Sequence, residues 1–121
     1  MSESGAVPKV VELSNLQLAA YNRADIDAFC ACYSEDIRVL DAEGNTTLQG
    51  MAAFRERYGK MFATMQGIRA EIIGRMTMGN HVVEHELWQR HDPTSGETQS
   101  GEVIVRYTEI DGKLAIAQFL H

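Results

Sequence analysis

The segment His81–His85, with the sequence HVVEH, has the residue types and spacing of a zinc-peptidase motif. In that motif two histidines one helical turn apart bind one metal ion, and the glutamate between them acts as a base. The motif requires a helix, whereas a Gly-Asn pair precedes this segment and two adjacent valines occupy its centre, which favours a strand. Residues four apart in a strand lie about 13 Å from each other. One zinc ion cannot bridge that distance, so we predict ordinary strand histidines and no metal site.

Cys30 and Cys32 are the only cysteines of the chain. They lie two residues apart in a segment with a helical pattern, where such neighbours point about 200° apart. A redox or metal role would need CxxC spacing and further ligands. We therefore predict two buried, unreactive thiols that do not pair.

The composition indicates a single domain over residues 1–121, with residues 1–6 as a flexible N-terminus. A chain of 121 residues that is 45% apolar can bury one core but not two. Its 17 acidic and 11 basic residues give a net charge of −6, which repels the phosphates of nucleic acids and anionic lipids. No apolar run approaches the ~20 residues that span a bilayer, and the first residues lack a signal-peptide pattern. We expect no nucleic-acid or membrane partner and a cytoplasmic location.

Hydrophobic spacing predicts helices at the front of the chain and strands behind them. The expected helices span residues 7–22, 26–33 and 51–65, the second with Asp25 as its N-cap. The expected strands span residues 37–41, 46–49, 68–78, 81–91, 99–110 and 113–120. Gly-Asn and Asp-Gly pairs supply turns between the long strands. This order predicts an α+β domain whose helices cover one face of a strongly curved sheet.

Five segments carry a likeness to a known family: AYNRADIDAF (20–29), YSED (33–36), VLD (39–41), GMAAFRERY (50–58) and DGK (111–113) before a last apolar strand. They resemble the ketosteroid isomerase-like, SnoaL-like branch of the NTF2-like superfamily, from about Val10 to Leu120. The resemblance implies a cone-shaped NTF2-like fold, with three N-terminal helices packed on a strongly curved, mixed, mainly antiparallel sheet around a deep pocket. It also implies a homodimer through the outer face of the sheet.

The resemblance assigns roles to individual residues. Asp41 matches the general base that carries a proton between two carbons beside a carbonyl. Tyr33 and Tyr58 match supporting tyrosines of a hydrogen-bonded network. Gln17 stands where the family has its catalytic tyrosine, and Ile104 lies near the position of a protonated aspartate. Because both acidic oxyanion donors are missing, the sequence argues against steroid isomerisation. Without the resemblance, Asp41 is better explained as a solvated carboxylate near a turn at the end of a strand, and with it the two explanations stand equal.

The family register turns Glu84, Glu86 and Trp88 toward the pocket, whereas alternation alone would turn the apolar residues between them inward. We favour the family register, because the outer face can be buried in a dimer. Glu86 would then face Asp41 as a second catalytic carboxylate, with one pKa raised by burial and like charge. The alternative is that both glutamates pair with arginines of adjacent strands, for which the candidates are Arg69, Arg75 and Arg106. Trp88, Phe54, Met61 and Met65 either line the pocket or belong to the core.

Three hypotheses for the function follow. The first is an enzyme of isomerase, hydratase or hydrolase type that uses Asp41, together with Glu86, on a small apolar substrate without a metal or organic cofactor. The second is a non-catalytic domain that binds a small apolar molecule between Trp88 and the tyrosines. The third is a dimerisation module without a specific ligand. An Asp41→Asn variant separates the first two, because an enzyme would lose turnover and keep its ligand.

Overall fold

The computed structural model describes residues 7–121, so the predicted flexible N-terminus, residues 1–6, lies outside the described residues. Two helices come first, α1 (Lys9–Asn22) and α2 (Ile26–Cys30). A hairpin of β1 (Tyr33–Leu40) and β2 (Thr46–Gln49) leads into α3 (Met51–Thr64). Four strands complete the chain: β3 (Gln66–Met78), β4 (His81–Asp92), β5 (Glu97–Ile110) and β6 (Lys113–Leu120).

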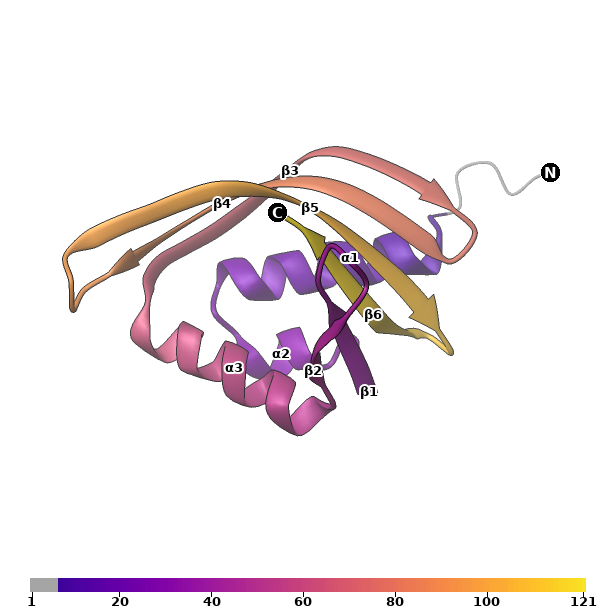
Figure 1. Cartoon of the computed structure of the whole chain (residues 1–121), viewed down its shortest axis with the longest axis horizontal. Helices are drawn as coiled ribbons and strands as arrows, with labels where there is room; N and C mark the ends of the chain where they lie inside the picture. The colour runs from indigo at the N-terminus through magenta and orange to yellow at the C-terminus, as the bar shows by residue number, and fades with distance from the viewer. Residues whose placement is uncertain (1–6) are drawn as a thin grey trace.

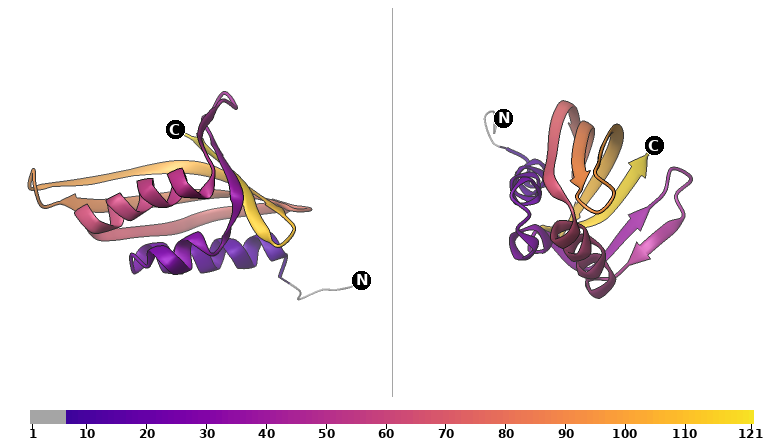
Figure 2. Two further views of the ribbon diagram at one scale, coloured as in Figure 1. Left: turned by 90° about the horizontal axis from the view of Figure 1, so that it is seen from below. Right: turned by 90° about the vertical axis from the view of Figure 1, so that its left-hand side faces the viewer.

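The strands of residues 7–121 form one mixed sheet in the order β2-β1-β6-β5-β4-β3. β1 and β6 are parallel, and the other neighbouring strands are antiparallel. Figures 1 and 2 show β3, β4 and β5 arching over the helices, which lie on the concave side of the sheet. The predicted α+β architecture, three helices on a strongly curved mixed sheet, is confirmed.

Local chemistry explains where several elements begin and end. The Asp25 side chain accepts a hydrogen bond from the Ala28 N–H at 3.1 Å, which makes it the N-cap predicted for α2. Asp111 and Gly112 both have positive φ, 53° and 83°, as the tight turn between β5 and β6 requires. Gly79 supplies the same freedom, with φ of 58°, between β3 and β4.

The predicted length of α2 is wrong. The helix ends at Cys30 rather than at Tyr33. The chain beyond it pairs with β6, since the Leu114 N–H donates to the Cys32 carbonyl at 2.9 Å and Tyr33 lies opposite Leu114 in the parallel ladder. The sheet therefore competes successfully for residues whose apolar spacing also suits a helix.

The main core lies between the helices and the concave face of the sheet. Phe29 of α2 is at its centre, with its ring 5.6 Å from the stacked ring of Phe54 and 4.9 Å from that of Tyr58. Cys30 and Cys32 are free and buried, as predicted, and burial raises the pKa of both thiols. No helix of residues 7–121 is long and apolar enough to cross a membrane.

Candidate functional site

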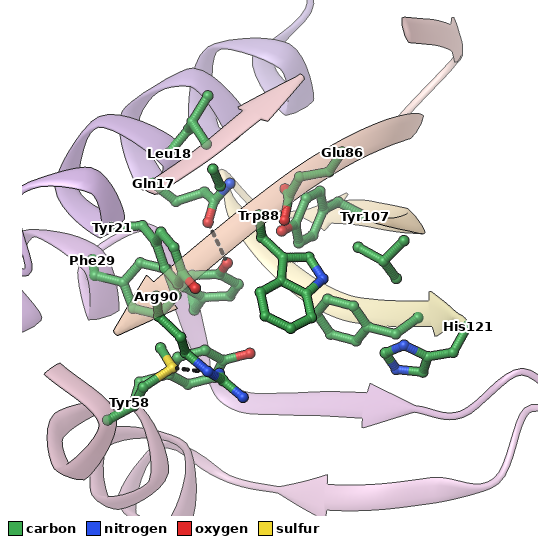
Figure 3. Close-up of a pocket in the computed structure, with 15 residues that line it drawn as sticks. Gln17, Leu18, Tyr21, Phe29, Tyr58, Glu86, Trp88, Arg90, Tyr107 and His121 are labelled. Atoms are coloured by element: carbon green, nitrogen blue, oxygen red, sulfur yellow. Dashed lines mark hydrogen bonds between the residues drawn. The ribbon is translucent and has the colours of Figure 1, made fainter. Parts of the chain in front are cut away.

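A cavity of about 220 Å³ lies between the helices and the concave face of the sheet. Its walls are largely aromatic and apolar, with polar groups that converge from several elements (Figure 3). These polar residues are Gln17 and Tyr21 on α1, Tyr33 on β1, Tyr58 on α3, Glu86 and Arg90 on β4, Tyr107 on β5, and His121 after β6. An apolar cavity with a few convergent polar groups is the usual form of a small-molecule site.

The register of β4 determines which of its side chains reach the cavity. Glu84 is fully buried on the concave side, and Glu86 and Trp88 line the cavity two and four residues further along. Leu87, between them, is 40% exposed on the outer face. The inward direction of these three residues agrees with the family register and not with simple apolar alternation. The outer face is therefore the more apolar one at this point of the strand.

Glu86 is the carboxyl group of the cavity. Within the described chain it has no hydrogen-bond or ion-pair partner, although both glutamates were candidates for pairing with arginine. Burial, and then the neighbouring charge of Glu84, raises its pKa to about 7. At neutral pH its protonated and ionised forms are therefore both populated, so it can either accept or donate a proton.

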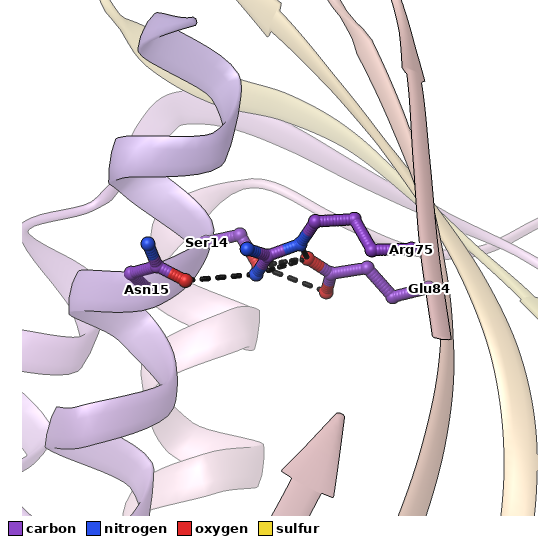
Figure 4. Close-up of polar contacts among 4 residues, drawn as sticks. All are labelled: Ser14, Asn15, Arg75 and Glu84. Atoms are coloured by element: carbon purple, nitrogen blue, oxygen red, sulfur yellow. Dashed lines mark hydrogen bonds and ion pairs between the residues drawn. The ribbon is translucent and has the colours of Figure 1, made fainter. Parts of the chain in front are cut away.

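Glu84 has the opposite environment, with both of its oxygens occupied (Figure 4). The Ser14 hydroxyl lies 2.8 and 2.7 Å from the two oxygens, and Arg75 Nη2 makes an ion pair at 2.7 Å. Arg75 Nε also donates to Glu84 at 2.8 Å, and Arg75 Nη2 donates to Asn15 Oδ1 at 2.8 Å. The predicted alternative of pairing with arginine is thus correct for Glu84. These contacts among Ser14, Asn15, Arg75 and Glu84 join α1 to β3 and β4.

A second polar pair lies at the cavity wall, where the Tyr33 hydroxyl donates to Gln17 Oε1 at 3.0 Å. This bond leaves the amide N–H₂ of Gln17 as a donor next to the cavity (Figure 3). Burial raises the pKa of Tyr33, Tyr58 and Tyr107. All three phenols stay protonated at neutral pH and can donate hydrogen bonds.

Asp41 lies elsewhere, in the turn between β1 and β2. Its Oδ1 accepts hydrogen bonds from the backbone N–H groups of Glu43 and Asn45, at 3.0 and 2.9 Å. The residue lines a wider groove of about 760 Å³, which shares Tyr58, Met61 and Arg90 with the cavity. Asp41 therefore holds a turn beside the mouth of the site, and the expected pair with Glu86 across one pocket is not formed.

Two further residues expected at the pocket lie outside it. Ile104 is 40% exposed on the outer face, opposite His85, and its neighbour Val103 faces the cavity instead. The pocket position that the resemblance assigned on β5 is therefore wrong by one residue. The side chain of Val103, like that of Ile104, donates no hydrogen bond. Phe54 is 1% exposed and lies behind the cavity wall, because its ring is stacked against Phe29 in the core.

The structure adds residues that the sequence analysis missed, above all Arg90 and Tyr107. Arg90 continues the alternation of Glu84, Glu86 and Trp88 along β4, and that period of two was the signal that could have found it. The HVVEH segment forms part of β4, as predicted, with the His81 ring 2.8 Å from Thr108 and the His85 ring 2.6 Å from Glu102. Among residues 7–121, no three His, Cys, Asp or Glu side chains are grouped to hold a metal ion.

Comparison with known proteins places the chain in context. A family profile described as the SnoaL-like domain matches residues 16–117. No curated protein is a significant match to the sequence.

Solved structures match over most of both chains. A Catenulispora acidiphila protein with a ketosteroid isomerase-like fold, in complex with trimethylamine, has a TM-score of 0.76 and 15% identity over 91% of this chain and 85% of its own. An LEH-like epoxide hydrolase from M. tuberculosis has a TM-score of 0.79 and 13% identity, over 93% of this chain and 81% of its own. A proposed polyketide cyclase from Xanthomonas campestris pv. campestris has a TM-score of 0.75 and 20% identity, over 93% of this chain and 90% of its own. At these identities the likeness shows a shared fold and no specific activity.

Proposed function

Since this chain belongs to the SnoaL-like domain family, we propose that it is a small-molecule enzyme in which Glu86 moves a proton on a small, largely apolar substrate. One observation carries the proposal. A carboxyl group without a partner in the described chain faces an aromatic cavity, and its pKa is raised to about 7. General acid–base catalysis is most effective when the pKa of the group lies near the working pH.

The reaction that suits this arrangement starts with removal of a proton from carbon beside a carbonyl group. Ionised Glu86 accepts that proton, and the carbonyl oxygen becomes an enolate oxygen. When the substrate has a carbon–carbon double bond between its β and γ carbons, the protonated Glu86 then gives the proton to the γ carbon, and the double bond moves into conjugation with the re-formed carbonyl. Hydrogen bonds from buried phenols such as Tyr107 and Tyr58, and from the Gln17 amide, would stabilise the enolate oxygen.

Asp41 has no part in this proposal. Its carboxylate already accepts two backbone hydrogen bonds in the β1–β2 turn, and it does not line the cavity. The fold supports the broader class, because proteins with this fold include those described as ketosteroid isomerase-like, epoxide hydrolase and polyketide cyclase. The same fold hosts different reactions, so the polar groups of the cavity decide the chemistry.

The test is the conversion of 3-cyclohexenone to 2-cyclohexenone, followed by the ultraviolet absorbance of the conjugated product. This ketone is small and has an acidic C–H beside its carbonyl. Glu86→Gln is expected to lower kcat/KM by about a hundredfold or more, because general base catalysis contributes that much. Glu71→Gln, a change on an exposed residue of β3, is the matched control and should leave the rate unchanged.

Turnover that survives in Glu86→Gln would overturn the assignment of Glu86. Activity that disappears in Asp41→Asn instead would return the base to Asp41. If the wild type binds the ketone, as quenching of Trp88 fluorescence reports, but shows no turnover, the chain is a binding domain. Trp88 is the only tryptophan and lines the cavity, so binding there changes its fluorescence; Trp88 also borders a second hollow beside Arg69 and Gly101.

A further inference from the structure

The guanidinium of Arg90 lies in the wall between the cavity and the wider groove that Asp41 lines, called the outer groove below. Its Nε donates to Gln99 Oε1 at 2.9 Å. Its Nη1 lies 3.2 Å from the sulfur of Met61, and its Cζ lies 5.0 Å from the centroid of the Trp88 ring, beside which Figure 3 shows it. These contacts fix the side chain, but none of them brings a negative charge. No carboxylate of the described chain forms an ion pair with it.

The partners of Arg90 occupy only part of its donor set. A guanidinium has five N–H donors in a planar fork that matches the two oxygens of a carboxylate. Gln99 takes the Nε donor and Met61, a weak acceptor, takes one from Nη1. The Nη2 group has no hydrogen-bond partner among residues 7–121. By contrast, Arg75 on the adjacent strand has its charge matched by Glu84.

The charges around Arg90 point the same way. Arg57 and Lys60 line the outer groove together with it, and Asp41 is the one acidic residue among the described residues of that groove, while Glu86 lines the cavity side. The chain as a whole carries a net charge of −6. A basic groove on an acidic protein attracts small anions to this mouth rather than to the rest of the surface.

We propose that Arg90 binds the carboxylate of the substrate, so that the ligand is a small apolar carboxylic acid whose hydrocarbon part enters the cavity toward Glu86. A cavity of about 220 Å³ is below the usual size range of drug-sized sites, which sets the ligand as a small ring or short chain. The inference names the substrate class of the site proposed above and rests on that proposal for its reaction. The binding step itself requires no turnover.

The experiment compares two ligands of nearly the same shape, 3-cyclohexene-1-carboxylate and its neutral amide, by quenching of Trp88 fluorescence. Wild type is expected to bind the acid at least about tenfold more tightly, because a hydrogen bond to a charged group contributes that much. Arg90→Gln is expected to lose this preference while its affinity for the amide stays within about threefold. Calorimetric titration repeats the comparison, because Arg90 itself contacts Trp88.

Three controls make the result specific. Arg69→Gln removes an exposed arginine of β3 and should keep the preference for the acid. Arg57→Gln removes a positive charge from the outer groove without touching Arg90, so it tests the long-range attraction of anions to the groove. It is expected to reduce the preference for the acid by less than Arg90→Gln does. Arg90→Lys keeps the charge without the planar fork and should keep part of the preference.

Equal affinity of wild type for acid and amide would overturn the inference, as would a preference that survives in Arg90→Gln. A loss in Arg57→Gln as large as in Arg90→Gln would assign the effect to the long-range attraction of anions to the groove, which also overturns it. Failure of the proposed function is distinguishable: the acid preference would remain while Glu86→Gln left ketone turnover unchanged.

Discussion

At the scale of single residues, two glutamates on one face of β4 have different surroundings and therefore different chemistry. Glu84 is fully buried, and its charge is matched by Arg75 and by the hydroxyl of Ser14. Glu86, two residues further along, has no such partner in the described chain and faces the cavity. The charge of Glu84 helps to raise the pKa of Glu86, although burial is the larger cause. Glu84 holds the structure together, and Glu86 is the group that the proposed reaction uses.

The raised pKa of Glu86 predicts that stability falls as the pH rises. Its pKa is about 7 in the folded chain against an ordinary 4.5. Between these values the folded protein holds a proton that the unfolded chain has released, so the free energy of unfolding decreases with pH, by at most about 3 kcal/mol in total. Glu86→Gln removes this loss. Urea unfolding at about pH 5 and about pH 8 should show the variant gaining on wild type at the higher pH.

Glu71→Gln is the control for that measurement, because Glu71 is exposed on β3. The difference in free energy of unfolding between Glu71→Gln and wild type should be small and the same at both pH values. A Glu86→Gln variant whose difference from wild type does not change with pH would contradict the raised pKa.

At the scale of elements, the Ser14–Glu84–Arg75 group fixes α1 against β3 and β4 (Figure 4). Gln17 and Tyr21 follow Ser14 on the same face of α1, three and seven residues later, and both line the cavity. The group therefore determines how α1 stands over the cavity. Sequence spacing cannot reveal it, since Ser14 and Glu84 are 70 residues apart along the chain.

Removing Arg75 should strongly destabilise the fold. Arg75→Met leaves the fully buried Glu84 charge unpaired, which costs about 3 kcal/mol or more in comparable buried pairs. Replacing both partners, Glu84→Leu with Arg75→Met, removes the charge itself and should recover most of the loss. Urea unfolding of the two single variants and the double variant forms the required cycle. A loss below about 1 kcal/mol in Arg75→Met, or no recovery in the double variant, would contradict this role.

The sequence predicted the helices and strands better than it predicted which face of the sheet each side chain lies on. The helix-then-strand order, the Asp25 cap and the Asp111-Gly112 turn rest on local chemistry and were correct. The end of α2 was wrong because pairing with β6 decides it. Ile104 was placed on the wrong face because a slip of one residue reverses a whole strand, and β5 carries no motif that fixes its register.

The candidate site was predicted in part for the same reason. Gln17, Tyr33, Tyr58, Glu86 and Trp88 line one cavity, whereas Asp41 lies in a turn. Whether a strand-end aspartate faces a pocket or caps its own turn depends on the path of the next few residues. Here Asn45 returns close enough to donate to it. The resemblance supplied a position for Asp41 but not that local path.

At the scale of the whole molecule, the convex face of the sheet has no helix over it in the described chain (Figures 1 and 2). Leu87, Ile104 and Leu120 lie on β4, β5 and β6 on this face, and each is 40% exposed. Ile104 is directly opposite Leu120 across the β5–β6 ladder and opposite His85 on β4. Three exposed aliphatic side chains on adjacent strands are the kind of surface that a second copy of the chain would cover.

We therefore keep the prediction of a homodimer through this face. Sedimentation equilibrium should give twice the mass of one chain, and Ile104→Glu should give a monomer, because it would bury two like charges at a two-fold contact. Leu16→Glu, at an aliphatic position on α1 that is 54% exposed, is the control and should remain dimeric. A monomeric wild type, or a dimeric Ile104→Glu variant, would contradict the prediction. The cavity is lined by one chain, so monomeric Ile104→Glu should still prefer the carboxylate ligand, which separates assembly from binding.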